Sequence, residues 1–329
     1  MNIGIVTPAP AGSRFGNRVT AIRWAKILKG LCHRVSISES YNGEPFDMLV
    51  ALHARRSADS IRRFRRLHPE APLIVALTGT DLYHDIKRSK RAQASLDVAT
   101  RIVVLQPQAL EELDPTLRKK ARAIHQSVSQ SLKIRSPLPV KGFDVCVVGH
   151  LRPVKDPFRA AMAVRRLPKS SRIRVIHLGA ALTETEAARA RKEMISNTRY
   201  KWRGEVSPSQ VAAVMSKSRL FVISSRMEGG ANALGEAIVA GLPVLASRIP
   251  GSIGILGDDY PGYFHVGNTR ELARLMLRCE GDSRFLADLR NRCQSLATLF
   301  DPDRERTAWM SLLDEMLPSP QYSRKRLGG

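Results

Sequence analysis

Residues 220–246 read LFVISSRMEGGANALGEAIVAGLPVLA, and this stretch decides the predicted fold. The apolar run 220–223 predicts a buried strand, and the run 237–244 predicts the end of a helix and the next strand. The residues between them are mostly small, with Gly229 and Gly230 at the centre, so backbone N–H groups and a helix start can approach a phosphate. A strand, a glycine loop, a helix and another strand are typical of a parallel α/β sheet.

Two glutamates, Glu228 and Glu236, flank this glycine loop eight residues apart. We expect Glu228 in the loop and Glu236 about two turns into the helix that follows. A carboxylate can accept hydrogen bonds from two neighbouring hydroxyls, such as those of a ribose. The pair therefore indicates a nucleotide site, although two solvated glutamates would give the same pattern.

The length and composition fit a two-domain globular protein. A chain of 329 residues, 43% of them hydrophobic, can form two domains with cores of their own. The sequence does not open with a signal-peptide pattern, and no run reaches the ~20 apolar residues of a membrane span. The four cysteines are scattered, as expected in a reducing compartment. We therefore expect a cytoplasmic protein without stable membrane insertion and without a bound metal.

The net charge of +23 permits several partners, including nucleic acid, an anionic membrane surface or an anionic substrate. Arginine is spread along the whole chain and is densest at 61–66. No zinc-finger spacing, RNA-binding aromatic motif or helix-turn-helix pattern accompanies it. A solvated arginine-rich surface and an anion-binding cleft both explain the charge, and we expect no nucleic-acid partner.

Short apolar runs alternate with helical patterns in both halves of the chain. Strands are expected at 3–6, 34–38, 46–52, 72–77, 101–105, 143–149, 174–179, 220–223 and 244–246. Helices are expected at 19–31, 58–67, 157–167, 209–218 and after Asn232. The polar stretch 126–142, with two prolines, predicts a linker.

This alternation predicts an α/β protein with two open domains, whose parallel sheets face a central cleft. Ligands should bind there at the carboxyl ends of the strands. We expect an N-terminal domain over 1–140, a C-terminal domain over 141–303, and a C-terminal helix and tail over 304–329. The helix should pack back on the N-terminal domain, and the end at 318–329 should fray.

The segment 149–155, GHLRPVK, follows the first strand of the second half. Its arginine offers a planar fork and its lysine a point charge, which together suit a diphosphate. A basic surface turn is the alternative. The turn after Trp202, which contains Arg203, could bind a nucleobase through its backbone, but a helix entry explains it equally well.

Three loops of the first half also carry groups that suit an anion. The loop 10–18 holds two glycines and many N–H donors, the loop 53–57 adds cations, and the loop 77–83 adds two hydroxyls and a carboxylate. Ordinary strand–helix turns, with Asp81 as a helix N-cap, are the alternative. The sequence has no Walker loop, His-Glu-x-x-His motif or Gly-x-Ser-x-Gly elbow.

The segments 149–155 and 228–236 resemble the donor-site signatures of the retaining nucleotide-sugar glycosyltransferases of family 4. The resemblance covers nearly the whole chain, including the Trp202 turn and residues 249–251, and implies the GT-B fold, with two Rossmann-like domains. The chain departs from the family at His150, where arginine is usual; Arg152 is the nearest substitute.

The segments 16–21, 51–57, 77–83 and 149–152 are similar to those of the selenosugar synthases of selenoneine biosynthesis, a branch of the same class. The resemblance implies that a UDP-sugar, UDP-N-acetylglucosamine or UDP-glucose, reacts with selenophosphate to give a 1-selenosugar, UDP and phosphate. It implies no cofactor and no metal. Selenophosphate synthetase and selenoneine synthase would be its pathway partners.

The resemblance also implies three groups of site residues. The catalytic residues are Glu228, Arg152, Lys155 and Asp81. The donor-binding residues are Glu236, Gly229, Gly230, Ala231, Asn232, His150 and Arg203. The acceptor-binding residues are Gly12, Ser13, Asn17, Arg18, Thr78, Gly79, Thr80 and Arg55, with Arg56 behind them. Asp81 or His84 would direct water to the phosphorus.

Two other functions stay open at this stage. An ordinary family 4 enzyme would act on an oxygen acceptor such as a saccharide or lipid, and its basic surface would dock on a membrane. A nucleic-acid-binding α/β protein is favoured by the charge alone. It predicts steeply salt-dependent binding that survives Glu228→Gln and Glu236→Gln.

Overall fold

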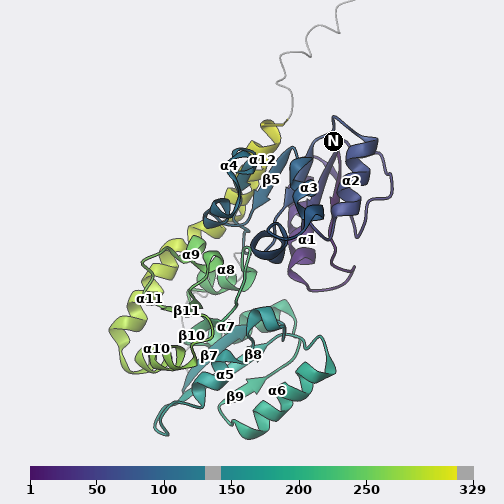
Figure 1. Cartoon of the computed structure of the whole chain (residues 1–329). Coiled ribbons are helices and arrows are strands. Elements are labelled where there is room, and N and C mark those ends of the chain that lie inside the picture. Colours follow the sequence, from purple (N-terminus) through teal and green to yellow (C-terminus); the bar gives the residue numbers. More distant parts are fainter. Residues whose placement is uncertain (130–141, 317–329) are drawn as a thin grey trace, which may run out of the picture. The chain divides into compact units, whose positions relative to one another are not determined.

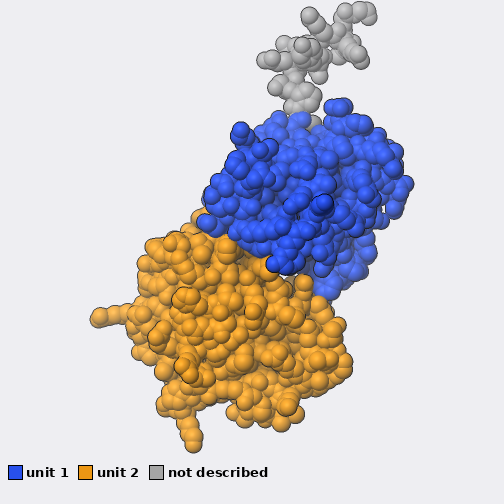
Figure 2. All heavy atoms as spheres, in the orientation of Figure 1, with its two compact units in different colours: residues 1–126, 302–329 blue, residues 127–301 orange. Residues whose placement is uncertain are grey.

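The structure, a computed structural model, describes residues 1–129 and 142–316. These residues form two compact units, shown in Figure 2. Unit 1 combines residues 1–126 with the segment that begins at Pro302, and unit 2 lies within 127–301. The linker expected at 126–142 falls mostly outside the described residues, and the tail expected at 318–329 falls wholly outside them.

Unit 1 is built on a six-stranded parallel sheet with the order β2-β1-β3-β4-β5-β6 (Figure 1). The strands are β1 (Asn2–Val6), β2 (Arg34–Ser38), β3 (Met48–Leu52), β4 (Leu73–Ala76), β5 (Arg101–Val104) and β6 (Ala121–Ala123). The helices are α1 (Gly16–Gly30), α2 (Ala58–Leu67), the π-turn η1 (Asp81–Asp85), α3 (Lys90–Asp97), η2 (Pro107–Glu112), α4 (Pro115–Lys119) and α12 (Pro302–Asp314). Every strand expected in this half is present.

Unit 2 repeats the plan, with the strand order β12-β11-β10-β7-β8-β9. The strands are β7 (Phe143–Val148), β8 (Ile173–Leu178), β9 (Tyr200–Trp202), β10 (Leu220–Ile223), β11 (Val244–Ser247) and β12 (Tyr263–Phe264). The helices are η4 (Pro153–Lys155), α5 (Arg159–Val164), α6 (Glu184–Ser196), α7 (Pro208–Lys217), α8 (Asn232–Val239), α9 (Pro250–Leu256), α10 (Thr269–Gly281), α11 (Ser283–Leu296) and η5 (Ala297–Phe300). The predicted strand, loop, helix and strand at 220–246 are confirmed.

The core of unit 1 lies on both faces of its sheet, because a strand covered on both sides alternates its side chains between two apolar layers. Along β3, Met48 and Val50 pack with Trp24 on one face, and Leu49 packs with Phe64 on the other. This burial explains why β3 is apolar throughout.

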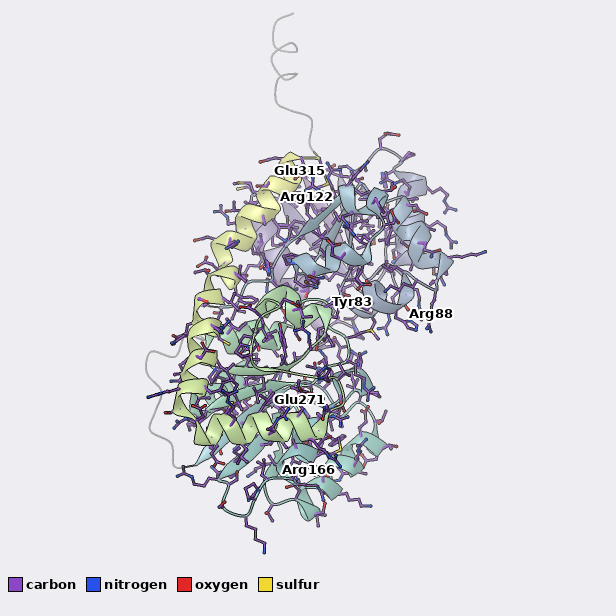
Figure 3. All side chains as sticks on the ribbon, turned by 60° about the vertical axis from the view of Figure 1, so that its left-hand side comes forward. Tyr83, Arg88, Arg122, Arg166, Glu271 and Glu315 are labelled. Atoms are coloured by element: carbon purple, nitrogen blue, oxygen red, sulfur yellow. The ribbon has the colours of Figure 1, made fainter. Side chains whose placement is uncertain are left out.

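The last helix, α12, belongs to unit 1 and packs against α1 (Figure 1). The rings of Trp24 and Trp309 meet edge to face, with centroids 4.9 Å apart. The Trp24 indole N–H donates to the buried Glu305 carboxylate at 2.8 Å. Beyond the helix, Glu315 accepts from Arg122 at 2.8 Å, and the two side chains lie together in Figure 3. Unit 1 is therefore assembled from both ends of the chain.

In each sheet, the chain adds strands first on one side of the starting strand and then on the other. At the point where this order reverses, the two neighbouring strands connect to helices on opposite faces of the sheet. In unit 1 the reversal lies between β1 and β3, and in unit 2 between β7 and β10. Ligands of open α/β sheets bind at the carboxyl ends of the strands at such a point. The topology therefore selects the loops that begin at Thr7, His53, Gly149 and Ser224.

We predict that Trp309→Ala lowers the free energy of unfolding by about 3–5 kcal/mol, because it removes a fully buried ring. Urea denaturation followed by circular dichroism measures the change. Met310→Ala is the matched control, since Met310 is 46% exposed on the same helix and should change stability by no more than ~0.5 kcal/mol. Equal effects of the two substitutions would show that α12 does not complete the core.

Candidate functional site

A small pocket lies in unit 2 at the reversal point of the sheet, between the carboxyl ends of β7 and β10. It is lined by residues 147–150 and 222–225 together with Lys155, Pro157 and His177. Two of the expected site residues, His150 and Lys155, thus share one pocket. The lining residues do not include Arg152, Arg203, Glu228 or the other expected donor-binding residues at 229–232 and 236.

Glu228 is buried in the loop after β10, as expected, and one of its oxygens is held by two donors. Lys155 Nζ and Ser225 Oγ both lie 2.5 Å from Glu228 Oε1. The side chains of Glu228 and Lys155 are 8% and 31% exposed, so this ion pair is better shielded from water than a surface pair. Among the described residues no bond is made to Oε2, which leaves that oxygen able to accept from a ligand.

Further hydrogen bonds join the loop of Lys155 to the loop of Glu228. Ser224 Oγ donates to the carbonyl of Asp156 at 2.9 Å, and the N–H of Arg226 donates to the carbonyl of Val154 at 2.8 Å. Gly251 closes against the same loop, because a Cβ on it would lie 2.1 Å from the carbonyl oxygen of Glu228. The ion pair thus joins two loops that are also held together by hydrogen bonds to backbone carbonyls.

A buried histidine holds the glycine turn after β7. His177 Nε2 lies 3.0 Å from the carbonyl oxygen of Gly149, which can only accept, so the ring proton is on Nε2. Its Nδ1 then accepts from the Tyr200 hydroxyl at 2.9 Å. Burial lowers the pKa of His177 to about 4, so the ring is neutral at pH 7.

A second contact brings the turn at Gly179 onto the turn at Gly149. A Cβ on Gly179 would lie 2.0 Å from the Gly149 carbonyl oxygen, so only glycine fits there. Trp202 Nε1 donates to the Gly179 carbonyl at 2.8 Å, and His150 Nδ1 accepts from the N–H of Ala180 at 3.1 Å. The turn at Trp202 therefore holds Gly179 against Gly149, and Gly149 lines the pocket.

The donor-binding residues expected at 229–232 and 236 lie at the start of α8. Gly229, Gly230 and Ala231 are buried, and Ala231 has a positive φ of 29°. The helix begins at Asn232, close to where it was expected, so Glu236 lies about one turn into α8. The expectation of two turns was wrong, because the step from Asn232 to Glu236 covers only about one turn of an α-helix.

In unit 1, the loop that contains Gly12 is held by its own backbone and by a glutamate. The Ser13 hydroxyl donates to the Pro10 carbonyl at 2.8 Å, and the N–H of Ala11 donates to Glu39 Oε1 at 2.9 Å. Arg18, in the first turn of α1, has a buried Nε without a hydrogen-bond partner among the described residues. A buried donor of this kind favours an acceptor atom from a ligand.

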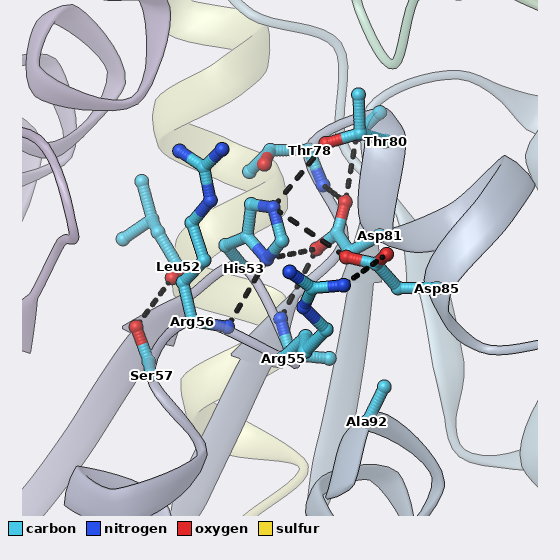
Figure 4. A network of polar contacts seen from close by, with 12 residues as sticks. Leu52, His53, Arg55, Arg56, Ser57, Thr78, Thr80, Asp81, Asp85 and Ala92 are labelled. Carbon is cyan, nitrogen blue, oxygen red and sulfur yellow. Dashed lines mark hydrogen bonds and ion pairs between the residues drawn. The ribbon is translucent and has the colours of Figure 1, made fainter. Parts of the chain in front are cut away.

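Asp81 is fully buried and ties the β4 loop to the β3 loop (Figure 4). Its Oδ1 accepts from the N–H groups of Thr78 and Gly79, each at 2.9 Å. Its Oδ2 accepts from the N–H of Ala54 at 3.1 Å. Both oxygens are occupied, which favours a role in holding the loops over contact with a substrate. Asp81 is no helix N-cap, because the N–H groups that it accepts from precede it in the chain.

The other acceptor-side residues lie around this loop. Thr78 and Thr80 are half-buried, and Arg55 reaches Asp85 Oδ1 at 3.3 Å with its own side chain half-exposed. His84 Nδ1 contacts the same Asp85 oxygen at 3.1 Å. The structure therefore brings the loops 53–57 and 78–81 together.

Three residues of these networks were not predicted as site residues. Ser225 could have been found, because it precedes Glu228 by three residues in a loop whose other members were singled out. His177 contacts Gly149 and Glu39 contacts Ala11, in each case 28 residues away, and no pattern in the sequence predicts these contacts.

The described residues show neither a metal-binding cluster nor a membrane-spanning helix. Within residues 1–129 and 142–316, no three His, Cys, Asp or Glu side chains gather in a way that could hold a metal ion. In the same ranges, no helix combines the length and apolar character needed to cross a membrane.

Comparison with known proteins identifies the family. Residues 129–298 match the family described as Glycosyl transferases group 1. This is more than half of the chain, and the protein belongs to that family. Its fold, with two six-stranded parallel sheets, is GT-B. A sequence comparison with curated proteins found no match.

Three solved structures illustrate the fold. HepE from Anabaena in complex with UDP and glucose is 15% identical, with a TM-score of 0.77 over 96% of this chain and 100% of that one. Sucrose-phosphate synthase from Thermosynechococcus elongatus is 15% identical, with a TM-score of 0.78 over 96% and 98%. The pneumococcal O-GlcNAc transferase GtfA, in complex with UDP and GlcNAc, is 16% identical, with a TM-score of 0.65 over 90% and 59%.

We predict that His177 makes the protein less stable in acid. The pKa of His177 is about 4 in the folded chain and about 6.5 in the unfolded chain. Between these two values the unfolded state binds a proton that the folded state does not bind, so acid favours unfolding. The free energy of unfolding should fall by roughly 3 kcal/mol between pH 7 and pH 4 on this account.

Urea denaturation at several pH values measures this loss. In His177→Gln the loss between pH 7 and pH 4 should shrink by about that amount, whereas the exposed His265→Gln should keep it. An unchanged pH dependence in His177→Gln would refute the assignment.

Proposed function

We propose that this protein transfers a sugar from a UDP-sugar to selenophosphate, releasing UDP and phosphate. Membership of Glycosyl transferases group 1 supports the transfer of a glycosyl group. The single observation that carries the donor assignment is the Lys155–Glu228 ion pair, in which Lys155 lines the pocket and Glu228 keeps one oxygen without a hydrogen bond among the described residues. Solved structures of the same fold contain UDP, UDP-glucose, or UDP with GlcNAc, which is consistent with this donor.

The donor would bind at the carboxyl end of the sheet in unit 2. Lys155 and Arg152 would neutralise the diphosphate as it leaves, with help from N–H groups at the start of α8. Glu228 would accept from a sugar hydroxyl through Oε2, and Glu236 would accept from the ribose. His150, Arg203 and the buried residues Gly229, Gly230 and Ala231 would complete the donor site with Asn232. UDP-N-acetylglucosamine or UDP-glucose is the proposed donor.

The acceptor side would lie in unit 1. Selenophosphate needs cationic groups and N–H or O–H donors more than it needs a base, since its selenium is already largely deprotonated. Arg18 supplies a buried donor that has no partner among the described residues, and Thr78, Thr80 and Arg55 add further donors. Gly12, Ser13, Asn17 and Gly79 would contribute from the same loops.

The chemistry would proceed in two balanced steps. The selenium forms a bond to the anomeric carbon while the bond from that carbon to the diphosphate oxygen breaks and its electron pair leaves with UDP. Water then attacks phosphorus, and the phosphorus–selenium bond breaks to give phosphate and the selenolate of the sugar. His84 would direct this water, and Asp81 would act by holding the loops.

Phosphorus NMR of the purified protein with UDP-N-acetylglucosamine and selenophosphate tests the proposal. We expect the selenophosphate signal to be replaced by that of inorganic phosphate and the UDP-sugar signals by those of UDP, with phosphate and UDP formed in equal amounts. The same mixture with a sugar acceptor in place of selenophosphate is the control. If UDP forms only with the hydroxyl acceptor, the selenium assignment fails and an oxygen-transferring enzyme replaces it.

The two glutamates should differ in what they bind. Glu236→Gln should raise the Kd for UDP by about tenfold, because an amide replaces a charge-assisted acceptor of the ribose hydroxyls. Glu228→Gln should leave the Kd for UDP within about twofold but slow turnover on the order of 100-fold.

Isothermal titration calorimetry with UDP and a turnover assay with the UDP-sugar separate these effects. Glu184→Gln, on the exposed face of α6 with its side chain 80% exposed, is the control and should change neither quantity. If Glu236→Gln binds UDP as tightly as the wild type, the ribose assignment is wrong.

A further inference from the structure

His53, at the end of β3, is buried, titratable and held in an unusual backbone conformation. It is 3% exposed, and its φ of +75° lies in the left-handed region, which costs a non-glycine residue on the order of 1 kcal/mol or more. The surrounding bonds keep it there. Its N–H donates to the Ala76 carbonyl at 2.8 Å, and the Ser57 hydroxyl donates to the Leu52 carbonyl at 2.7 Å. A strained residue retained in this way is a candidate for function.

The contacts of the His53 ring determine which nitrogen carries the proton (Figure 4). The N–H of Arg56, which can only donate, points to Nδ1 at 3.4 Å. Nε2 lies 3.3 Å from the Thr80 hydroxyl oxygen. The neutral ring therefore carries its proton on Nε2 and donates it to Thr80 Oγ1.

The charges around the ring oppose one another. Asp81 Oδ2 lies 3.9 Å from Nδ1 and Asp85 Oδ2 lies 3.9 Å from Nε2, and both favour the protonated ring. Arg55 and Arg56 disfavour it, and Arg55 and His84 already contact Asp85. Burial is the largest influence and lowers the pKa of His53, so the neutral ring is the form present at pH 7.

A hydroxyl oxygen that accepts from His53 has its own proton free to donate elsewhere. Thr80 is half-buried in the loop after β4, two residues from the half-buried Thr78. The cationic Arg55 contacts Asp85, which lies near the same His53 ring. Such a directed donor suits an oxygen that carries negative charge and no hydrogen.

We propose that His53 is a positioning residue that orients the Thr80 hydroxyl toward an oxygen of an oxyanionic acceptor. The proposal rests on the acceptor role given to this loop above. It adds the residue that orients the Thr80 hydroxyl and the class of ligand, an oxyanion, that this hydroxyl would bind.

A double-mutant cycle in the full-length enzyme tests this with saturating UDP-N-acetylglucosamine and varied selenophosphate. His53→Ala and Thr80→Val should each raise the KM for selenophosphate about tenfold and leave the KM for the UDP-sugar unchanged. The double variant should be no worse than Thr80→Val alone, since both remove one interaction. Thr80→Ser and His53→Gln, which keep an O–H or N–H donor in place, should recover much of the loss. Additive effects, or an unchanged KM, would overturn the proposal.

A second readout separates this proposal from the proposed reaction. In protein labelled with ¹⁵N at histidine, the His53 ring should show the Nε2–H form at neutral pH, and inorganic phosphate should shift its signals in the wild type but not in Thr80→Val. If phosphate shifts them while selenophosphate is not consumed, the reaction is wrong and the oxyanion site stands. If phosphate leaves His53 unchanged, the proposal for His53 fails whatever the enzyme turns over.

Discussion

The ion pair between Lys155 and Glu228 is the interaction on which the candidate site of unit 2 depends. It joins two loops that leave β7 and β10 at the point where the strand order reverses. A buried carboxylate is costly unless it is paired and hydrogen-bonded, and Glu228 meets both conditions through a single oxygen. The charge is thus retained while half of the acceptor capacity is left unused. The donor site that we propose would need both properties, to accept from hydroxyls and to neutralise a leaving diphosphate.

The parts around this pair are fixed by small residues and by buried polar groups. Gly179 and Gly251 allow backbones to approach to distances that a side chain would prevent. His177 and Trp202 then satisfy the carbonyls of Gly149 and Gly179 that this approach buries. Since buried carbonyls without partners are costly, the glycines and their donors depend on one another.

Much of the fold and part of the site could be predicted from the sequence. The period of the apolar runs gives the strands at 220–223 and 244–247 and the helix between them, and the glycines mark the loop that carries Glu228. The depth of Glu236 follows from the helix start near Asn232 that the sequence predicts, whereas the positive φ of Ala231 could not be predicted, because no residue preference indicates it. The edge strands β9 and β12 have three and two residues, too few to show a period. His53 and His177 act through ring contacts with distant residues, and only the tertiary structure supplies those.

The return of α12 to unit 1 has a consequence for how the chain is made. Synthesis proceeds from the N-terminus, so all of unit 2 leaves the ribosome before α12 does. Until then Trp24 lacks both Trp309 and Glu305, and the face of α1 that they cover stays open to water. Unit 2 can fold as a continuous segment, whereas unit 1 must wait as an incomplete intermediate with apolar surface exposed. Unit 1 can therefore complete its core only after α12 has been synthesised, later than the whole of unit 2.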